Sequence, residues 1–166
     1  MRKSKRTSKI LFHREHRMPD QSNNNLPDHP VVISWPVQWG DQDLFGHVNN
    51  TVYFRWYESA RIAYLDRIGV SEMMNRDRVG PILAAISCNY RRQLNFPDTV
   101  EIGSRITRIG RSSATMTHAI WSREQRVLVA DGESTIVMFD YQAQRPVPVP
   151  DAIRQAIENL EGRTLS

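Results

Sequence analysis

The 166-residue chain lacks several features that define common classes of protein. Its one cysteine, Cys88, has no partner for a disulfide within the chain, which fits a reducing cytoplasm. No apolar run approaches the roughly 20 residues needed to span a bilayer, and no secretory signal opens the chain. The sequence therefore predicts a cytoplasmic protein without a membrane span, and its length suits one domain.

Lysine is absent after residue 9, and the basic charge of the chain is unevenly placed. Residues 1–17 carry seven basic side chains and one acid, so the remainder is net negative although the whole chain has a net charge of +4. The composition changes at Met18, which leads to the hypothesis that residues 1–17 precede the true start. Because the body has no basic stripe with interleaved aromatic residues, we expect no nucleic-acid partner.

Motifs of several catalytic classes are missing. No Gly-x-Ser-x-Gly elbow points to a serine hydrolase. No cluster has metal-ligand spacing, so we expect neither a metal nor a cofactor. Cys88 ends the apolar run Ile82–Cys88 and has no close histidine, so we interpret it as a small buried strand residue.

One long helix is predicted with particular clarity. Between Asn49 and Gly69, apolar residues recur at three- and four-residue spacing and form a wide apolar face. Asn49 or Asn50 is a suitable N-cap, and Gly69 is a suitable residue just past the C-terminal end. Asp151 follows a proline-rich stretch and is a candidate cap for a second, short helix.

Strand patterns occupy most of the remaining sequence. Before the helix, apolar residues alternate from Ile33 to Trp39, and Pro36 indicates an edge strand. After the helix and a short polar segment, strand-like segments with short connections favour antiparallel pairing, and Gly132 is an expected β-bulge. Those segments are residues 82–94, 100–106, 114–121 and 126–140.

This element order predicts an α+β fold. A single apolar helix must bury its face, and a curled antiparallel sheet wrapped around it satisfies that need. Such a unit leaves sheet edges open, so we predict dimerisation through an edge strand. His118, on one of the strands, is interpreted as a packing residue.

The segment from Gly40 to Tyr53 is the candidate for chemistry. Asp41 and Asp43 are two residues apart in a loop, so one carboxylate can enter a pocket while the other stays solvated or caps a turn. The helix that follows offers free backbone N–H groups and a positive dipole end. A carboxylate beside such donors suits acyl transfer, and a thioester suits it best because a thiol, with a pKa of about 8.5, leaves without a strong acid.

The run Asp41–Asn50, with Tyr53, Glu58 and Ala60-Arg61 downstream, resembles the signature of hot-dog-fold thioesterases of the 4-hydroxybenzoyl-CoA thioesterase type. The resemblance extends from about residue 31 to about residue 145. It implies one long central helix wrapped by a curved antiparallel sheet of about five strands, with active sites at a dimer interface. It also implies hydrolysis of an acyl-CoA to a free acid and CoA by a homodimer or homotetramer, with Asp43 as nucleophile or general base.

Composition, together with the extent of the resemblance, divides the chain into three parts. Residues 1–30, basic and then polar, are expected to be a disordered extension. Residues 31–145 are the expected hot-dog thioesterase domain, and residues 146–166 are a proline-rich connection followed by a short helix.

Further site residues are expected around Asp43. His47 and Asn50 are candidate catalytic residues, with an ordinary loop histidine and a helix cap as the alternative interpretations. Some members of the family carry His or Tyr where this chain has Asn49-Asn50. The candidate substrate contacts here are Gly46, Asn49 and Tyr53, although Tyr53 also suits the core.

The CoA phosphates require fixed cations, because the net-negative body supplies no general attraction. The expected turn at residues 107–113 offers Arg108, Arg111 and Ser112, and arginine binds phosphate through paired donors. The family has a basic, serine-containing nucleotide contact at a corresponding connection. An ordinary solvated hairpin is the alternative.

Two other functions stay open. Hot-dog 2-enoyl-CoA hydratases pair an aspartate and a histidine about five residues apart, and Asp43 and His47 are four apart. A non-catalytic acyl-thioester-binding protein would use the same fold. The sequence specifies neither the acyl chain nor the choice between CoA and acyl carrier protein.

Overall fold

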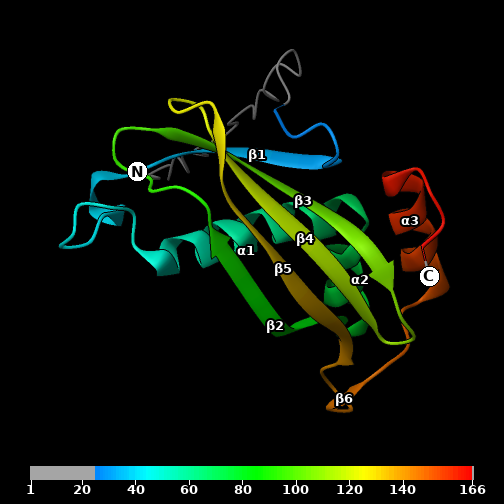
Figure 1. Cartoon of the computed structure of the whole chain (residues 1–166). Coiled ribbons are helices and arrows are strands. Elements are labelled where there is room, and N and C mark those ends of the chain that lie inside the picture. The colour runs from blue at the N-terminus through cyan, green and yellow to red at the C-terminus, as the bar shows by residue number, and fades with distance from the viewer. Residues whose placement is uncertain (1–24, 166) are drawn as a thin grey trace, which may run out of the picture.

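Figure 1 shows the computed structural model, which describes residues 25–165. The basic segment 1–17 and the hypothesis of a start at Met18 lie outside the described residues. In chain order the elements are β1 (Val31–Pro36), η2 (Trp39–Asp41), α1 (Asn50–Arg67), α2 (Val70–Asp77), β2 (Val79–Tyr90), β3 (Thr99–Ile109), β4 (Ser113–Ser122), β5 (Val127–Asp140), β6 (Arg145–Pro146) and α3 (Asp151–Glu161).

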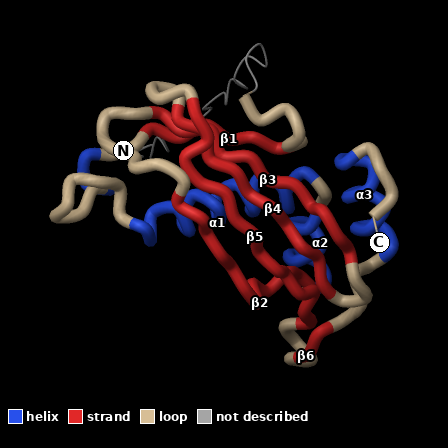
Figure 2. The backbone as a smooth tube through the Cα atoms, in the orientation of Figure 1, coloured by secondary structure: helices blue, strands red, loops and turns tan. Residues whose placement is uncertain are grey.

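The described strands form one antiparallel sheet. Its order is β1-β3-β4-β5-β2, and the short strand β6 pairs with β5. The twisted sheet lies over α1, with α2 and α3 near the end of α1 that is farther from its N-terminus (Figures 1 and 2). The predicted α+β hot-dog fold is therefore confirmed. β1 is an edge strand, as Pro36 indicated, and β2 is the other edge.

The predicted boundaries of α1 are also confirmed. The Asn49 side chain caps the helix by accepting a hydrogen bond from the Thr51 N–H at 2.9 Å. At the other end, Gly69 adopts a left-handed φ of 78°, which glycine tolerates without the clash that a Cβ would introduce. The helix therefore begins directly after the acidic loop, with its N-terminal donors beside that loop.

Two local predictions differ from the structure. The polar segment after Gly69 forms the helix α2, which buries only Val70 and Met73, so its apolar spacing extends over a single helical turn and is a weak signal. Strand β2 ends at Tyr90 rather than continuing to residue 94, because the N–H groups of Arg91 and Arg92 both turn to the Val129 carbonyl.

The predicted β-bulge at Gly132 is wrong. Gly132 pairs regularly with Cys88 on β2 and His118 on β4, and the register shifts lie elsewhere. A Cβ at this position would overlap the Ser87 carbonyl oxygen and lie 3.0 Å from the Tyr57 ring. Glycine is therefore required for the close approach of a neighbouring strand and an aromatic ring, and not for an irregular backbone.

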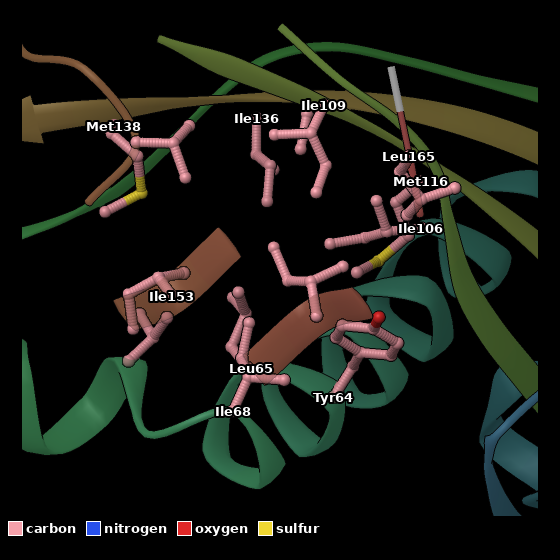
Figure 3. Packing of buried hydrophobic residues seen from close by; sticks show 14 of the residues in the cluster. Tyr64, Leu65, Ile68, Ile106, Ile109, Met116, Ile136, Met138, Ile153 and Leu165 are labelled. Atoms are coloured by element: carbon pink, nitrogen blue, oxygen red, sulfur yellow. The ribbon is translucent and has the colours of Figure 1, made fainter. Parts of the chain in front are cut away.

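The core contains two apolar clusters at different levels along α1. The first contains Tyr64, Leu65 and Ile68, which face side chains of the sheet and of α3 in Figure 3. The second lies nearer to the N-terminus of α1 and includes Trp56 and Val48. The acidic loop therefore borders the second cluster and is separated from the first by the length of the helix.

Glu161 fastens α3 to the sheet. The Glu161 side chain is only 1% exposed. Its carboxylate accepts hydrogen bonds from the Tyr64 hydroxyl and the Ile106 N–H, both at 2.7 Å. Arg105 Nε lies 3.5 Å from the same carboxylate. The pairing of β1 with β3 stops at Ser104, so Glu161 takes the place of a strand partner for the Ile106 donor.

Candidate active site

The acidic loop between η2 and α1 is a closed hairpin. Gln42 and Val48 form an isolated antiparallel bridge, and the Asp43 N–H donates to the His47 carbonyl at 2.9 Å. The Gly46 N–H donates back to the Asp43 carbonyl at 3.0 Å, and Gly46 has a left-handed φ of 77°. These bonds hold Asp43 at the base of the turn, just before α1.

Two side chains that the sequence analysis did not select hold this loop against the β2–β3 connection. Asn95 Nδ2 donates to the Gly46 carbonyl at 2.5 Å, and the Gln42 side chain accepts the Phe96 N–H at 2.9 Å. The Val48 N–H adds a bond to the Leu94 carbonyl at 2.8 Å. The partners are about fifty residues apart in sequence, so no local pattern predicted them.

The Asp43 carboxylate has one engaged and one available oxygen. Oδ1 accepts the Phe45 N–H at 2.9 Å, which fixes the side-chain orientation. Among residues 25–165, Oδ2 has no hydrogen-bond partner, and the side chain is partly exposed. A positioned carboxylate with a free oxygen is the arrangement that a nucleophile or a general base requires.

Asp41 is used structurally. One of its carboxylate oxygens accepts the Gln38 N–H at 2.9 Å, and the other lies 3.5 Å from Arg55. Its backbone carbonyl accepts the Asn49 N–H at 2.8 Å. Both carboxylate oxygens of Asp41 thus have partners, whereas Asp43 keeps one oxygen free.

The N-terminus of α1 offers fewer free donors than the sequence suggested, because the cap residue engages two of them. The Asn49 side chain accepts the Thr51 N–H, and the Val52 N–H donates to the Asn49 carbonyl at 3.0 Å. The Asn50 N–H has no acceptor within the described part of the chain, and the residue is exposed. It is therefore available to an oxyanion near the positive end of the helix dipole.

Other predicted site residues lie at different depths. His47 is half-buried in the loop and contributes its backbone carbonyl to the hairpin. Tyr53 is only 3% exposed and packs edge-on against Tyr90, with 5.0 Å between ring centroids. Burial raises the pKa of the Tyr53 hydroxyl, so Tyr53 stays neutral. Within a single chain, Tyr53 is therefore a residue of the second apolar cluster, next to the loop, and not an exposed substrate contact.

Within one chain, the predicted phosphate turn is not near Asp43. Arg108, Arg111 and Ser112 lie at or after the end of β3 that is opposite to the acidic loop. The ten steps from Thr99 to Ile109 span about 33 Å. The Arg111 carbonyl accepts the Val149 N–H, which ties the turn to the segment before α3, and the Ser112 carbonyl accepts the Met138 N–H of β5.

Large apolar side chains are exposed around the loop and along β2. In the loop, Leu44 is 97% exposed and Phe45 is 82% exposed. On the edge strand β2, the exposed large apolar residues are Ile82, Leu83 and Tyr90. Several large exposed apolar side chains on one strand and an adjoining loop indicate an interaction surface.

The curved sheet around one helix, with an acidic loop at the helix N-terminus, places the chain in the class of hot-dog thioesterases. The structure superposes on a thioesterase from Thermus thermophilus, crystallised with coenzyme A and Zn, with a TM-score of 0.74 and 34% identity, covering 83% of this chain and 98% of that chain. Residues 37–157 match the model of the Thioesterase-like superfamily, and the chain belongs to that family.

Two relatives carry named activities. Long-chain acyl-CoA thioesterase FadM of Escherichia coli strain K12 is 25% identical over 118 residues, which cover 71% of this chain and 89% of that protein. Acyl-CoA thioester hydrolase YbgC of Escherichia coli O157:H7 is 27% identical over 126 residues, covering 74% and 93% respectively. In the described part of the chain, no helix is both long enough and apolar enough to cross a membrane.

Proposed function

We propose that the protein is an acyl-CoA thioesterase in which Asp43 is the nucleophile or general base. The observation that carries this proposal is the free Oδ2 of Asp43 beside the exposed N-terminus of α1. Membership of the thioesterase-like family and the named activities of FadM and YbgC support the reaction class. The coenzyme A bound to the Thermus relative supports CoA as the carrier.

In the base mechanism, Asp43 accepts a proton from water while the water oxygen attacks the thioester carbonyl. The developing oxyanion is stabilised by the Asn50 N–H and the helix dipole. The carbon–sulfur bond then breaks, and CoA leaves as a thiolate that takes up a proton. In the nucleophilic mechanism, Asp43 attacks the thioester carbonyl and expels CoA as a thiolate, and water then hydrolyses the resulting anhydride to the free acid and the Asp43 carboxylate. Gly46, His47 and Asn49 shape the loop around the acyl group.

The active assembly is proposed to be a dimer formed through β2. This strand is twelve residues long, has an open edge and exposes Ile82 and Leu83, whereas the other edge strand is shorter and contains Pro36. Antiparallel pairing of two β2 edges would satisfy the free backbone groups and cover the apolar side chains. Light scattering tests this assembly, and an active monomer at micromolar concentration would contradict it.

The CoA phosphates are proposed to bind at the turn that carries Arg108, Arg111 and Ser112. Because this turn is distant from Asp43 in one chain, the proposal requires the turn of the second copy, which an antiparallel pairing places at the same end as Asp43. The doubly substituted variant Arg108→Ala with Arg111→Ala should raise KM for acyl-CoA and affect a short acyl-thiol without the nucleotide much less. An equal loss on both substrates would contradict phosphate binding.

A panel of acyl-CoA substrates, followed by thiol release, tests the reaction. We expect release of free CoA together with the carboxylic acid. Hydration of a 2-enoyl-CoA without thiol release would instead identify a hydratase, the alternative in which Asp43 and His47 act as a pair. Binding of acyl-CoA without turnover would identify a non-catalytic acyl-thioester-binding protein.

A further inference from the structure

A layer of polar residues crosses the core between the two apolar clusters. Ser104 lies between Ile102 and Ile106 on β3, and His118 occupies the paired position on β4. Ser134 on β5 is bonded to His118, and Arg61 on α1 is near enough for its charge to act on His118. All four polar side chains are buried, and Arg61 is only 8% exposed.

The three sheet residues form a continuous hydrogen-bonded line. Ser104 Oγ lies 2.8 Å from His118 Nδ1, and His118 Nε2 lies 2.9 Å from Ser134 Oγ. The Tyr57 ring stacks on the imidazole with 4.6 Å between centroids. Burial, followed by the charge of Arg61, lowers the pKa of His118 to about 3, so the imidazole is neutral at physiological pH.

The polar layer contains more hydrogen-bond donors than acceptors. A neutral imidazole donates one hydrogen bond and accepts one, so one of the two serines must accept and keeps its own O–H. No acceptor for that hydroxyl is found within residues 25–165. Arg61 Nη1 is also buried without a partner, and no carboxylate of the described residues lies within ion-pair distance of Arg61.

A buried cation without a counter-ion is strongly unfavourable unless another group completes it. Burial lowers the pKa of Arg61, which reflects this penalty, and the nearby Glu58 opposes the shift only through its charge at a distance. The chemistry that would complete the layer is an anion with several acceptor oxygens. A carboxylate matches both unused donors, because it accepts from a guanidinium and a hydroxyl at once.

We propose that this layer is a subsite for a carboxylate at the distal end of the acyl group, with Arg61 as its specificity-determining residue. The proposal rests on the thioesterase function argued above and adds a substrate class, the acyl-CoAs that carry a second carboxylate. Arg61 lies eleven residues after Asn50 on α1. The helical rise places it about 16 Å from the N-terminus of α1, so an acyl chain lying along α1 reaches from Asp43 to Arg61.

The experiment compares dodecanedioyl-CoA with dodecanoyl-CoA, whose acyl chains are long enough for the span of about 16 Å, and adipyl-CoA with hexanoyl-CoA, whose chains are too short for it. For the wild type, dodecanedioyl-CoA should have a kcat/KM about tenfold or more above dodecanoyl-CoA, because a charged hydrogen bond contributes on this scale, and the short pair should show no such preference. Arg61→Met keeps the volume and removes the donors, and it should lower that ratio roughly tenfold to a hundredfold, mainly through KM. Arg67→Met changes an exposed arginine of the same helix and should leave the ratio unchanged.

A second measurement, of Tm, tests whether the subsite binds a free carboxylate that is not part of an acyl-CoA. Sodium hexanoate should raise the Tm of the wild type, hexanamide should not, and Arg61→Met should abolish the difference. Stabilisation by hexanoate without a preference for dicarboxylyl-CoA would overturn the assignment to substrate. Equal ratios in the wild type and in Arg61→Met, or weaker dimerisation of Arg61→Met with an unchanged ratio, would overturn the subsite itself.

The wild-type ratios remain decisive if Arg61→Met does not fold, because methyl-ended substrates preferred at every length would refute the proposal. Failure of the proposed function is distinguishable from this outcome. If no acyl-CoA of either series releases thiol, the reaction is wrong, and the hexanoate measurement still reports whether the carboxylate subsite exists.

Discussion

The buried imidazole of His118 should make the stability of the protein fall as the pH falls below neutrality. The side chain is 2% exposed, and burial together with the charge of Arg61 lowers its pKa from 6.5 to about 3. Below pH 6.5 the unfolded chain binds a proton that the folded protein does not accept. The free energy of unfolding therefore decreases as the pH falls from about 6.5 to about 3. Below about pH 3 the folded protein also binds the proton, so His118 causes no further decrease.

The expected size of the loss follows from the two pKa values. Between pH 7 and pH 5 the unfolded state gains about 2 kcal/mol from protonating this one histidine, and the full shift corresponds to roughly 5 kcal/mol. The interval avoids Asp77 and Asp131, whose pKa values are lowered from 3.8 and whose effects appear only at lower pH. A loss of about 2 kcal/mol is a substantial part of the stability of a domain of this size.

Urea denaturation at pH 7 and pH 5, at one protein concentration, measures this loss. Burial also lowers the pKa of His29, so the comparison is made between His29→Gln and the double variant His29→Gln with His118→Gln. The double variant should lose about 2 kcal/mol less than its parent between the two pH values, whatever its stability at pH 7. The same decrease in both proteins would refute a neutral, buried His118.

Three further changes test the site and its scaffold. Asp43→Asn should lower thioester hydrolysis at least about a hundredfold, whereas Asp41→Asn should lower it much less; equally mild effects on thiol release would refute the assignment. Gly132→Ala introduces an overlap with a backbone carbonyl and should destabilise the fold by roughly 1–3 kcal/mol, while Gly40→Ala meets no atom within 4 Å and should be nearly neutral in urea titrations. Glu161→Ala leaves two buried donors without their acceptor and should cost about 3 kcal/mol, and a change below about 0.5 kcal/mol would contradict a fastening role.

The sequence was informative where local chemistry decides structure. The capping asparagine, the left-handed glycine at the other end and the wide apolar face were enough to define α1. Alternation and short connections predicted antiparallel strands, and Pro36 predicted an edge. The acidic loop pointed to acyl transfer because a carboxylate immediately before a helix N-terminus combines a base with donors for an oxyanion.

Local patterns failed where the reason for a residue lies in another part of the chain. Gly132 was expected to form a bulge because glycine inside a strand often does so. The structure shows that a strand and a ring from distant segments approach its Cα. Helix α2 was missed because its own sequence is mostly polar and only two of its residues reach the core.

By itself, the sequence determined the central helix, the antiparallel direction of the strands and the position of the acidic loop, because these depend on spacing and on neighbouring residues. The short connection between β2 and β3 favoured their pairing, but β2 pairs with β5, so the strand order came only from the tertiary structure. Only the tertiary structure decided that Asp41 is engaged while Asp43 keeps a free oxygen, and that Asn95 holds the loop. It also decided that His118, which alternation assigned to packing, joins Arg61 in a polar layer. Hydrogen bonding, burial and charge compensation depend on residues that are distant in sequence, so they become readable only when the chain is folded.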